Sequence, residues 1–245
     1  MLKDYCIPTT DAGSEEDFVG EFWDDRWAKA AADLDARRKK VVRHPYYAFL
    51  RKFIARRPGA RVLDGGCGMG EWTLQLAAEG IETIGVDIAA RRIELLQQRF
   101  GEAQFRRASF LETGFPDASF DVVFNWDGAE HFEAGLQLAF REAWRILKPG
   151  GYFLASTPAH NFRHMLRGFL APPAENCAPN RRFYQYRCTR AEFHAELSVA
   201  GFAAERIVCL DAPGGRILPG WLIGHMILGI GRKPQAAASR PDSGQ

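Results

Sequence analysis

The chain lacks the features that mark several common classes of protein. Its five cysteines are an odd number and form no Cys-x-x-Cys pair, which disfavours both a disulfide framework and a zinc site. The apolar run from Ile217 to Ile230 is too short and too interrupted to span a bilayer, and no secretory signal is recognised. A formal net charge of +2 is too small to argue for nucleic acid. We therefore expect a cytoplasmic protein with reduced cysteines, no metal and no nucleic-acid partner.

The charges that are present are unevenly distributed. Residues 15–35 carry eight acidic side chains against Arg26 and Lys29, whereas residues 36–63 contain ten lysines and arginines and no acid. The favoured interpretation is the solvated face of an N-terminal helix, and the alternative is a face that contacts an anion.

Composition and length indicate one large α/β domain with less regular ends. Of the 245 residues, 47% are hydrophobic and 25% are charged, as in ordinary globular proteins. Residues 1–14 and 234–245 are poor in apolar side chains, so we expect them to be disordered. Between them we predict an N-terminal helical cap over 15–57, broken near Pro45, and the main domain over 58–233.

The segment from Val62 to Thr73 is the most informative in the chain. An apolar strand runs directly into four glycines within six positions, at 65, 66, 68 and 70. Because glycine has no Cβ, the backbone there can adopt positive φ and approach a ligand at distances that any side chain would block. A predicted helix follows at once, and the unpaired N–H groups at its start would face the same cavity. The sequence therefore predicts a turn that holds a ligand.

An acidic residue supports this interpretation of the turn. A second apolar run, residues 83–86, ends in Asp87, which lies 23 residues after Asp64. A doubly wound α/β fold places the carboxylate that binds a ribose at this position. The glycine spacing does not fit G-x-G-x-x-G, and no Gly-Lys-Ser or Gly-Lys-Thr follows, so NAD and the Walker type of nucleotide site are disfavoured.

From Arg61 onward, the pattern alternates between predicted strands and helices, which argues for a parallel sheet covered on both faces. We predict strands at 61–65, 82–87, 103–108, 120–126, 151–156, 203–210 and 225–232, and helices at 89–100, 135–147 and 189–200, the last ending before Gly201.

Four segments follow one another in an order that is typical of a known family. Residues 64–70 (Asp-Gly-Gly-Cys-Gly-Met-Gly) fit a strand that ends in D/E-x-G-x-G-x-G, and residues 85–88 (Gly-Val-Asp-Ile) supply the acid after the second strand. Residues 119–124 and 147–153 fit the fourth strand and the turn into the fifth. In these motifs the chain resembles the class I S-adenosylmethionine (SAM) dependent methyltransferases over roughly residues 58–233.

The resemblance implies a fold and a cofactor. The fold is a doubly wound, Rossmann-like sheet of seven strands in the order 3-2-1-4-5-7-6, with strand seven antiparallel, and the cofactor is SAM. Residues implied in cofactor binding are Asp64, Gly65, Gly66, Cys67, Gly68, Gly70, Asp87, Ile88, Ser109, Phe110 and Asn125.

Three of these residues have specific roles under this resemblance. Asp87 should accept hydrogen bonds from both ribose hydroxyls. Family members often carry an acid after strand three that accepts a hydrogen bond from the adenine amine. This chain has Ser109 and Phe110 there, so one hydrogen bond to Ser109 or stacking on Phe110 would replace that contact with the adenine.

The segment after the fourth strand bears on the acceptor. Residues 125–128 (Asn-Trp-Asp-Gly) lack the Pro-Pro motif of enzymes that methylate the adenine amine. Residues 129–132 (Ala-Glu-His-Phe) resemble the small-molecule branch that includes the ubiquinone-biosynthesis O-methyltransferases. We therefore expect a small-molecule acceptor, methylated at a hydroxyl oxygen, with His131 as the general base. In the alternative, His131 only shapes its loop; His160 and His164 are weaker candidates for the base.

Residues 158–188 form a predicted insertion over the active site. From Thr157 to Ala191 there are six arginines against the single acid Glu175, and residues 161–169 have the pattern of a basic amphipathic helix. A lid helix is favoured over a clamp for an anionic substrate, and contact with a membrane surface is the least favoured. An anionic acceptor with an apolar portion would be compatible with both the lid helix and the clamp.

Two rival functions stay open from the sequence. A methyltransferase that acts on RNA or protein is favoured only by the basic residues 36–63. A non-catalytic SAM-binding protein is favoured by the missing adenine acid and by the uncertain base.

Overall fold

The computed structural model describes residues 1–6, 13–29, 34–101, 104–162, 182–210 and 225–235. Its strands are β1 (Leu2–Cys6), β2 (Arg61–Gly65), β3 (Glu82–Asp87), β4 (Phe105–Arg107), β5 (Phe120–Trp126), β6 (Leu147–Pro158), β7 (Arg182–Arg187), β8 (Ala203–Leu210) and β9 (Met226–Arg232). Its helices are α1 (Glu15–Lys29), α2 (Leu34–Val41), α3 (Pro45–Ile54), α4 (Glu71–Ala78), α5 (Ala90–Phe100), the short 3₁₀ helix η1 (Ala129–His131), α6 (Leu136–Ile146) and α8 (Arg190–Val199).

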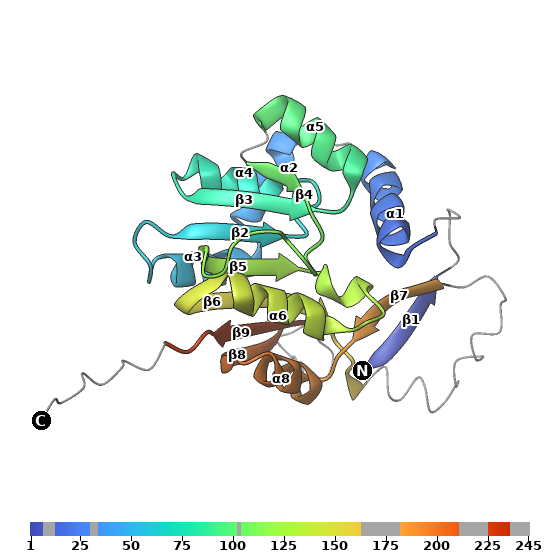
Figure 1. The fold of residues 1–245 in the computed structure, drawn as a ribbon, viewed down its shortest axis with the longest axis vertical. Helices are drawn as coiled ribbons and strands as arrows, with labels where there is room; N and C mark the ends of the chain where they lie inside the picture. Colours follow the sequence, from blue (N-terminus) through green and yellow to red (C-terminus); the bar gives the residue numbers. More distant parts are fainter. Residues whose placement is uncertain (7–12, 30–33, 102–103, 163–181, 211–224, 236–245) are drawn as a thin grey trace, which may run out of the picture.

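A seven-stranded sheet in the order β4-β3-β2-β5-β6-β9-β8 forms the centre of the molecule (Figure 1). The first five strands in this order pair in parallel, and β9 is antiparallel to both β6 and β8. In chain order this is 3-2-1-4-5-7-6, so the predicted topology is confirmed.

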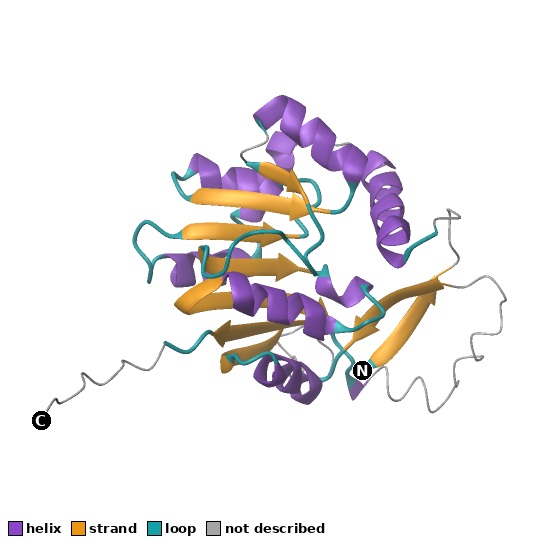
Figure 2. Ribbon diagram, in the orientation of Figure 1, coloured by secondary structure: helices purple, strands orange, loops and turns teal. Residues whose placement is uncertain are grey.

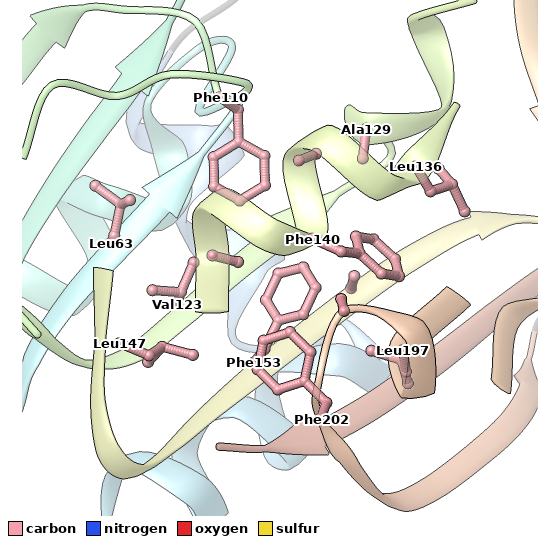
Figure 3. Close-up of a cluster of buried hydrophobic side chains, with 14 of the residues drawn as sticks. Leu63, Phe110, Val123, Ala129, Leu136, Phe140, Leu147, Phe153, Leu197 and Phe202 are labelled. Atoms are coloured by element: carbon pink, nitrogen blue, oxygen red, sulfur yellow. The ribbon is translucent and has the colours of Figure 1, made fainter. Parts of the chain in front are cut away.

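Helices cover both faces of the sheet (Figure 2). Neighbouring residues of one strand point to opposite faces: Val62 packs under α3 and α4, whereas Leu63 belongs to the core under α6 and α8. Figure 3 shows this second core, where the ring of Phe153 on the sheet meets Phe140 of α6 edge-on and stacks on Phe202. Burial of each such ring contributes about 1.5–3 kcal/mol.

The predicted elements match the observed ones closely, with two differences in length. The third parallel strand, β4, spans only 105–107. The fifth, β6, begins at Leu147 because that residue already pairs with Phe120, four residues before the predicted start of the strand. Gly150, with φ of +74°, lets the chain turn within this segment, and its N–H donates to the carbonyl of Lys233.

The first residues of the chain differ from the expectation of disorder over 1–14. Leu2–Cys6 forms β1, which pairs antiparallel with β7 in a separate two-stranded sheet. Lys3 lies 2.8 Å from Glu133, and Asp4 accepts a hydrogen bond from Arg187 at 2.7 Å. The partners are more than 100 residues away in the sequence, so the local composition of a short polar segment could not reveal this pairing.

The N-terminal helical segment is present as α1, α2 and α3, with the predicted break before Pro45. Much of the basic stretch 36–63 is paired with acids of the main domain, which supports the interpretation of a solvated face. The ion pairs are Arg37–Glu71, Arg51–Glu79, Arg56–Glu205 and Arg61–Glu82.

The predicted amphipathic helix at 161–169, most of the insertion 158–188 and most of the tail 234–245 lie outside the described residues. Within the described ranges, the structure contains no helix long and apolar enough to cross a membrane.

The packing of β9 against α8 predicts a specific loss of stability. A Cβ at Gly229 would lie 2.1 Å from the ring of Phe193, which is fully buried. We expect Gly229→Ala to destabilise the protein by about 1–3 kcal/mol through overpacking. Thermal unfolding should show a melting temperature lower by about 2–4 °C per kcal/mol. Gly13→Ala is the control, since no atom lies within 4 Å of its Cβ position; equal melting temperatures for the two variants would contradict the prediction.

Candidate functional site

A cavity of about 340 Å³ opens at the carboxyl ends of β2, β3 and β5. Open parallel sheets bind their ligands at this edge. The lining residues are Val19, Trp23, Trp27, His44, Tyr46, Asp64, Gly66, Cys67, Gly68, Met69, Glu71, Trp72, Asp87, Ile88, Ala108, Phe110, Asn125, Trp126, Asp127, Gly128, His131, Phe132 and Met226. The segments that line it therefore come from the cap as well as from the sheet.

The glycine turn between β2 and α4 forms one wall of this cavity. Gly66, Gly68 and Gly70 have φ of +78°, +51° and +75°, which L side chains rarely adopt. The N–H groups of Gly66 and Cys67 both donate to the carbonyl of Val86, at 2.8 and 2.9 Å. The turn is thereby fixed against the end of β3, and its surface stays open for a ligand.

Asp87 joins this turn to the start of α5. Its carboxylate accepts hydrogen bonds from the N–H of Gly68 at 2.8 Å and from the N–H of Ala89 at 2.9 Å. Burial raises the pKa of Asp87, and these backbone hydrogen bonds partly offset that effect. The carboxylate is therefore held in one orientation at the cavity wall.

Asp64 lies deeper, at the end of β2, and is 2% exposed. The hydroxyl of Thr73 donates to it at 2.8 Å. Burial raises the pKa of Asp64 to about 8, and the nearby carboxylates of Glu71 and Asp87 act in the same direction.

Asn125 ties the glycine turn to the segment after β5. Its Nδ2 donates to the carbonyl of Gly65 at 2.6 Å, and its Oδ1 accepts from the N–H of Ala129 at 2.9 Å. Gly65 itself is required by packing, since a Cβ there would lie 2.4 Å from the ring of Phe110.

The structure brings most of the predicted site residues together. Those that line the cavity are Asp64, Gly66, Cys67, Gly68, Asp87, Ile88, Phe110, Asn125 and His131. Gly65 and Gly70 shape the turn without lining the cavity. Ser109 also lies outside the lining, and its hydroxyl donates to Glu16 of α1 at 2.8 Å. Its predicted contact with the adenine stays a prediction.

An aromatic wall also lines the cavity, and none of its rings was predicted from the sequence as a site residue. Four cavity-lining rings contact one another in a closed circuit: His44, Tyr46, Trp126 and Trp72, with centroid distances of 4.6, 4.9, 5.6 and 5.5 Å. They come from α3, α4 and β5. The sequence shows these aromatic residues only as isolated neighbours of Pro45, of the glycine turn and of Asn125. Such positions do not reveal that the four rings are in contact.

Two tryptophans of α1 complete the wall from the side of the cap. Trp23 and Trp27 are stacked with centroids 5.0 Å apart, and Trp23 meets the ring of His131 edge-on at 5.0 Å. A Cβ at Gly68 would lie 3.1 Å from Trp27. The helix therefore lies directly over the glycine turn.

His131 is held at the junction of η1, α1 and β7. It is 4% exposed, and its Nδ1 lies 2.7 Å from the carbonyl of Tyr184. Burial lowers the pKa of His131 to about 4, although the backbone groups of Tyr184 and Asp127 oppose this. The ring is therefore neutral at pH 7, and donation from Nδ1 to Tyr184 leaves Nε2 as the proton acceptor.

Glu130, the neighbour of His131, is 1% exposed, and neither of its carboxyl oxygens has a hydrogen-bond partner. Burial, and then the nearby Asp127, raise its pKa well above the ordinary value. The side chain is therefore a neutral acid in the folded protein.

Among the described residues, no group of three His, Cys, Asp or Glu side chains could hold a metal ion. The residues that line the cavity fit SAM. The glycines keep a cradle open for the ligand, and Asp87 supplies a carboxylate for a ribose. The described lining holds four carboxylates and no lysine or arginine, which suits a cofactor with positive charge. When bound, SAM supplies an activated methyl group. Fold and site together define the class of SAM-dependent methyltransferases.

Comparison with known proteins gives the same class. Residues 63–155 match a family model described as a methyltransferase domain. The chain is 31% identical over 185 residues to a demethylmenaquinone methyltransferase of Symbiobacterium thermophilum, covering 69% of this chain and 70% of that protein. The chain belongs to the SAM-dependent methyltransferase family and is an enzyme that uses SAM.

Two further similarities extend this result. The chain is 34% identical over 116 residues to a 27-O-demethylrifamycin SV methyltransferase of Amycolatopsis mediterranei, covering 42% of each. The crystal structure of the PH0226 protein from Pyrococcus horikoshii superimposes with a TM-score of 0.60 at 22% identity, over 83% of this chain and 92% of that one. This second similarity shows the shared fold.

The unpartnered carboxyl group of Glu130 predicts a pH dependence of stability. The folded protein keeps a proton on Glu130 that the unfolded chain releases above the ordinary pKa of 4.5. Folding stability is therefore lost as the pH rises above that value, by at most about 1.4 kcal/mol per pH unit from this group. We expect Glu130→Gln to raise the melting temperature more at pH 8 than at pH 5. The exposed neighbour Glu133, changed to Gln, is the control; the same pH profile for both variants would show that Glu130 is not the group responsible.

Proposed function

We propose that this enzyme transfers the methyl group of SAM to a hydroxyl oxygen of a small-molecule acceptor. One observation carries the proposal: the glycine turn and Asp87 line the same cavity as His131 and the aromatic wall. Cofactor and acceptor would therefore meet inside one enclosure. The name of the rifamycin relative, which specifies an oxygen, supports this choice of atom.

On the cofactor side, the protein binds and orients. Asp87 accepts the ribose hydroxyls, since a carboxylate with two backbone hydrogen bonds still has lone pairs to accept more. The turn from Gly66 to Gly68 lies along the amino-acid portion. Holding donor and acceptor in line can supply roughly 7–11 kcal/mol of the barrier, so positioning is the main task of these residues.

On the acceptor side, His131 accepts a hydrogen bond from the hydroxyl through Nε2. With its pKa at about 4, the imidazole is too weak a base to ionise a hydroxyl beforehand. It takes the proton as the oxygen gains the methyl group, because the hydroxyl then becomes strongly acidic. Trp23, which contacts the ring edge-on, and Tyr184, which accepts from Nδ1, fix its orientation.

The aromatic wall fits an acceptor with an apolar, planar body. Rings of His44, Tyr46, Trp72 and Trp126 present faces and edges on which such a body can stack. A narrower form of the proposal adds an anionic group to the acceptor. Its support is the arginine-rich insertion, of which the structure describes Arg182, placed 5.1 Å from the ring of Phe18, and Arg187, paired with Asp4.

An amine nitrogen is the second candidate for the methylated atom. The described lining of the cavity holds the carboxyl groups of Asp64, Glu71, Asp87 and Asp127 and no lysine or arginine, which suits an amine as acceptor. A neutral amine also needs no general base. We further propose that the enzyme acts in the cytoplasm, in keeping with the four described cysteines, all of which are unpaired.

The role of Asp87 predicts a loss of cofactor affinity. We expect Asp87→Ala to bind SAM about 10- to 100-fold more weakly in a calorimetric titration, because it loses charge-assisted hydrogen bonds to the ribose. Glu82→Ala, which removes a carboxylate at the other end of the same strand, should bind as the wild type does. NAD should not bind to either protein. SAM affinity equal in both variants would remove Asp87 from the site.

The neutral state of His131 predicts the pH dependence of turnover. Turnover is measured as the rate of S-adenosylhomocysteine (SAH) formation with acceptors drawn from a panel of hydroxyl, amine and carbon nucleophiles. Because the pKa of His131 is about 4, the pH–rate profile between pH 6 and 8 should contain no step caused by ionisation of this residue. His131→Asn should lower kcat about 10²-fold or more and leave the affinity for SAM unchanged. A fall in activity with a midpoint near pH 6.5 that disappears in the variant would show that His131 acts instead as a conventional base.

A further inference from the structure

Asp64 lacks the counter-charge that a buried carboxylate normally has. It is 2% exposed, lines the cavity, and accepts its hydrogen bonds from Thr73 of α4 alone. No lysine, arginine or histidine of the described chain pairs with it. Removing an ionised carboxylate from water without a cation is costly, so such a group keeps its proton.

The groups that face Asp64 further favour its protonated form. Glu71 lies on α4 and is paired with Arg37 of α2 at 3.0 Å, and Asp87 lies at the end of β3. The thiol of Cys67 lies in the turn itself, and burial raises its pKa well above the ordinary value, so it adds no charge. From α1, the carboxylate of Asp24 acts on Asp87. The positive charges next to these groups are Arg37, paired with Glu71, and Arg91, which lies 3.5 Å from Asp24; neither pairs with Asp64.

The pKa of Asp64, raised to about 8, agrees with this geometry. At pH 7, the ligand-free protein carries Asp64 mainly in the protonated form. The cofactor of this family brings a positive sulfonium and an ammonium group into the same cavity, and an added cation favours ionisation of a nearby acid.

We propose that Asp64 exchanges its proton for the positive charge of SAM, so that cofactor binding releases a proton to solvent. The balance is one O–H bond broken on Asp64, one proton taken up by the buffer, and one carboxylate left beside the ligand. SAH has the same ammonium and carboxylate but a neutral sulfur, so Asp64 ionises less beside it. The residue thereby favours SAM over SAH. This inference rests on the cofactor and is independent of the acceptor.

Titration calorimetry tests the proposal on the intact protein. SAM and SAH are each titrated at pH 7 in phosphate and in Tris, whose different ionisation enthalpies give the number of protons released. We expect up to one proton for SAM and a smaller number for SAH. Between pH 6 and 8, SAM affinity should rise by up to about tenfold per pH unit, as linkage requires for one proton. The positive sulfonium lowers the pKa of the SAM amino group relative to that of SAH, so the titrations are repeated at pH 6 in phosphate and in MES, where the amino groups of both ligands are protonated.

The variant Asp64→Asn should bind SAM without this extra proton release and with a lower ratio of SAM to SAH affinity. Asp121→Asn is the matched control, because Asp121 lies at the opposite end of the sheet and is paired with Lys148 at 2.7 Å. Equal proton release for SAM and SAH in the wild type would overturn the proposal. So would proton release that persists in Asp64→Asn, since it would then come from another group such as Asp87. Should the variant fail to fold, the wild-type comparison of the two ligands decides alone.

Discussion

The turn between β2 and α4, and its attachment to the end of β3, is the constraint on which the site depends. Two successive N–H groups, those of Gly66 and Cys67, donate to the carbonyl of Val86, and the next glycine donates to Asp87. These hydrogen bonds fix the glycine turn and Asp87 relative to each other. Because three glycines of the turn have positive φ, the backbone can make them without side chains filling the cavity.

Every other part of the site is placed with reference to this turn. Asn125 connects it to η1, and so to His131, while Trp27 of α1 covers it from above. The position of α1 is set in turn by Asp24, which is 7% exposed and accepts from the N–H groups of Arg91 and Arg92 at 3.0 and 2.9 Å. Asp24 of α1 thus binds the N-terminus of α5, the helix that follows Asp87. The cavity is closed by such contacts between segments that are distant in the sequence.

The same enclosure has an electrostatic consequence. The carboxyl groups of Asp64 and Glu130 keep their protons in the folded protein, because the effect of burial on their pKa outweighs that of their few hydrogen-bond partners. His131 is neutral for the same reason. The sequence predicts a histidine at the site, and its burial in the structure makes it a weak base.

The sequence by itself determined where the strands lie and most of the residues predicted for the site, because both depend on local patterns. Strands such as 61–65, the spacing of the glycines and the acid at 87 are each encoded within a few residues, whereas the strand order was implied by the family that these motifs resemble. Tertiary structure alone decided three things: the pairing of β1 with β7, the closed circuit of rings around Trp126, and the protonation of Asp64, Glu130 and His131. The physical reason is the same in each case. Contacts between residues far apart in the chain, and the burial they produce, are properties of the packed molecule that no local pattern of residues contains.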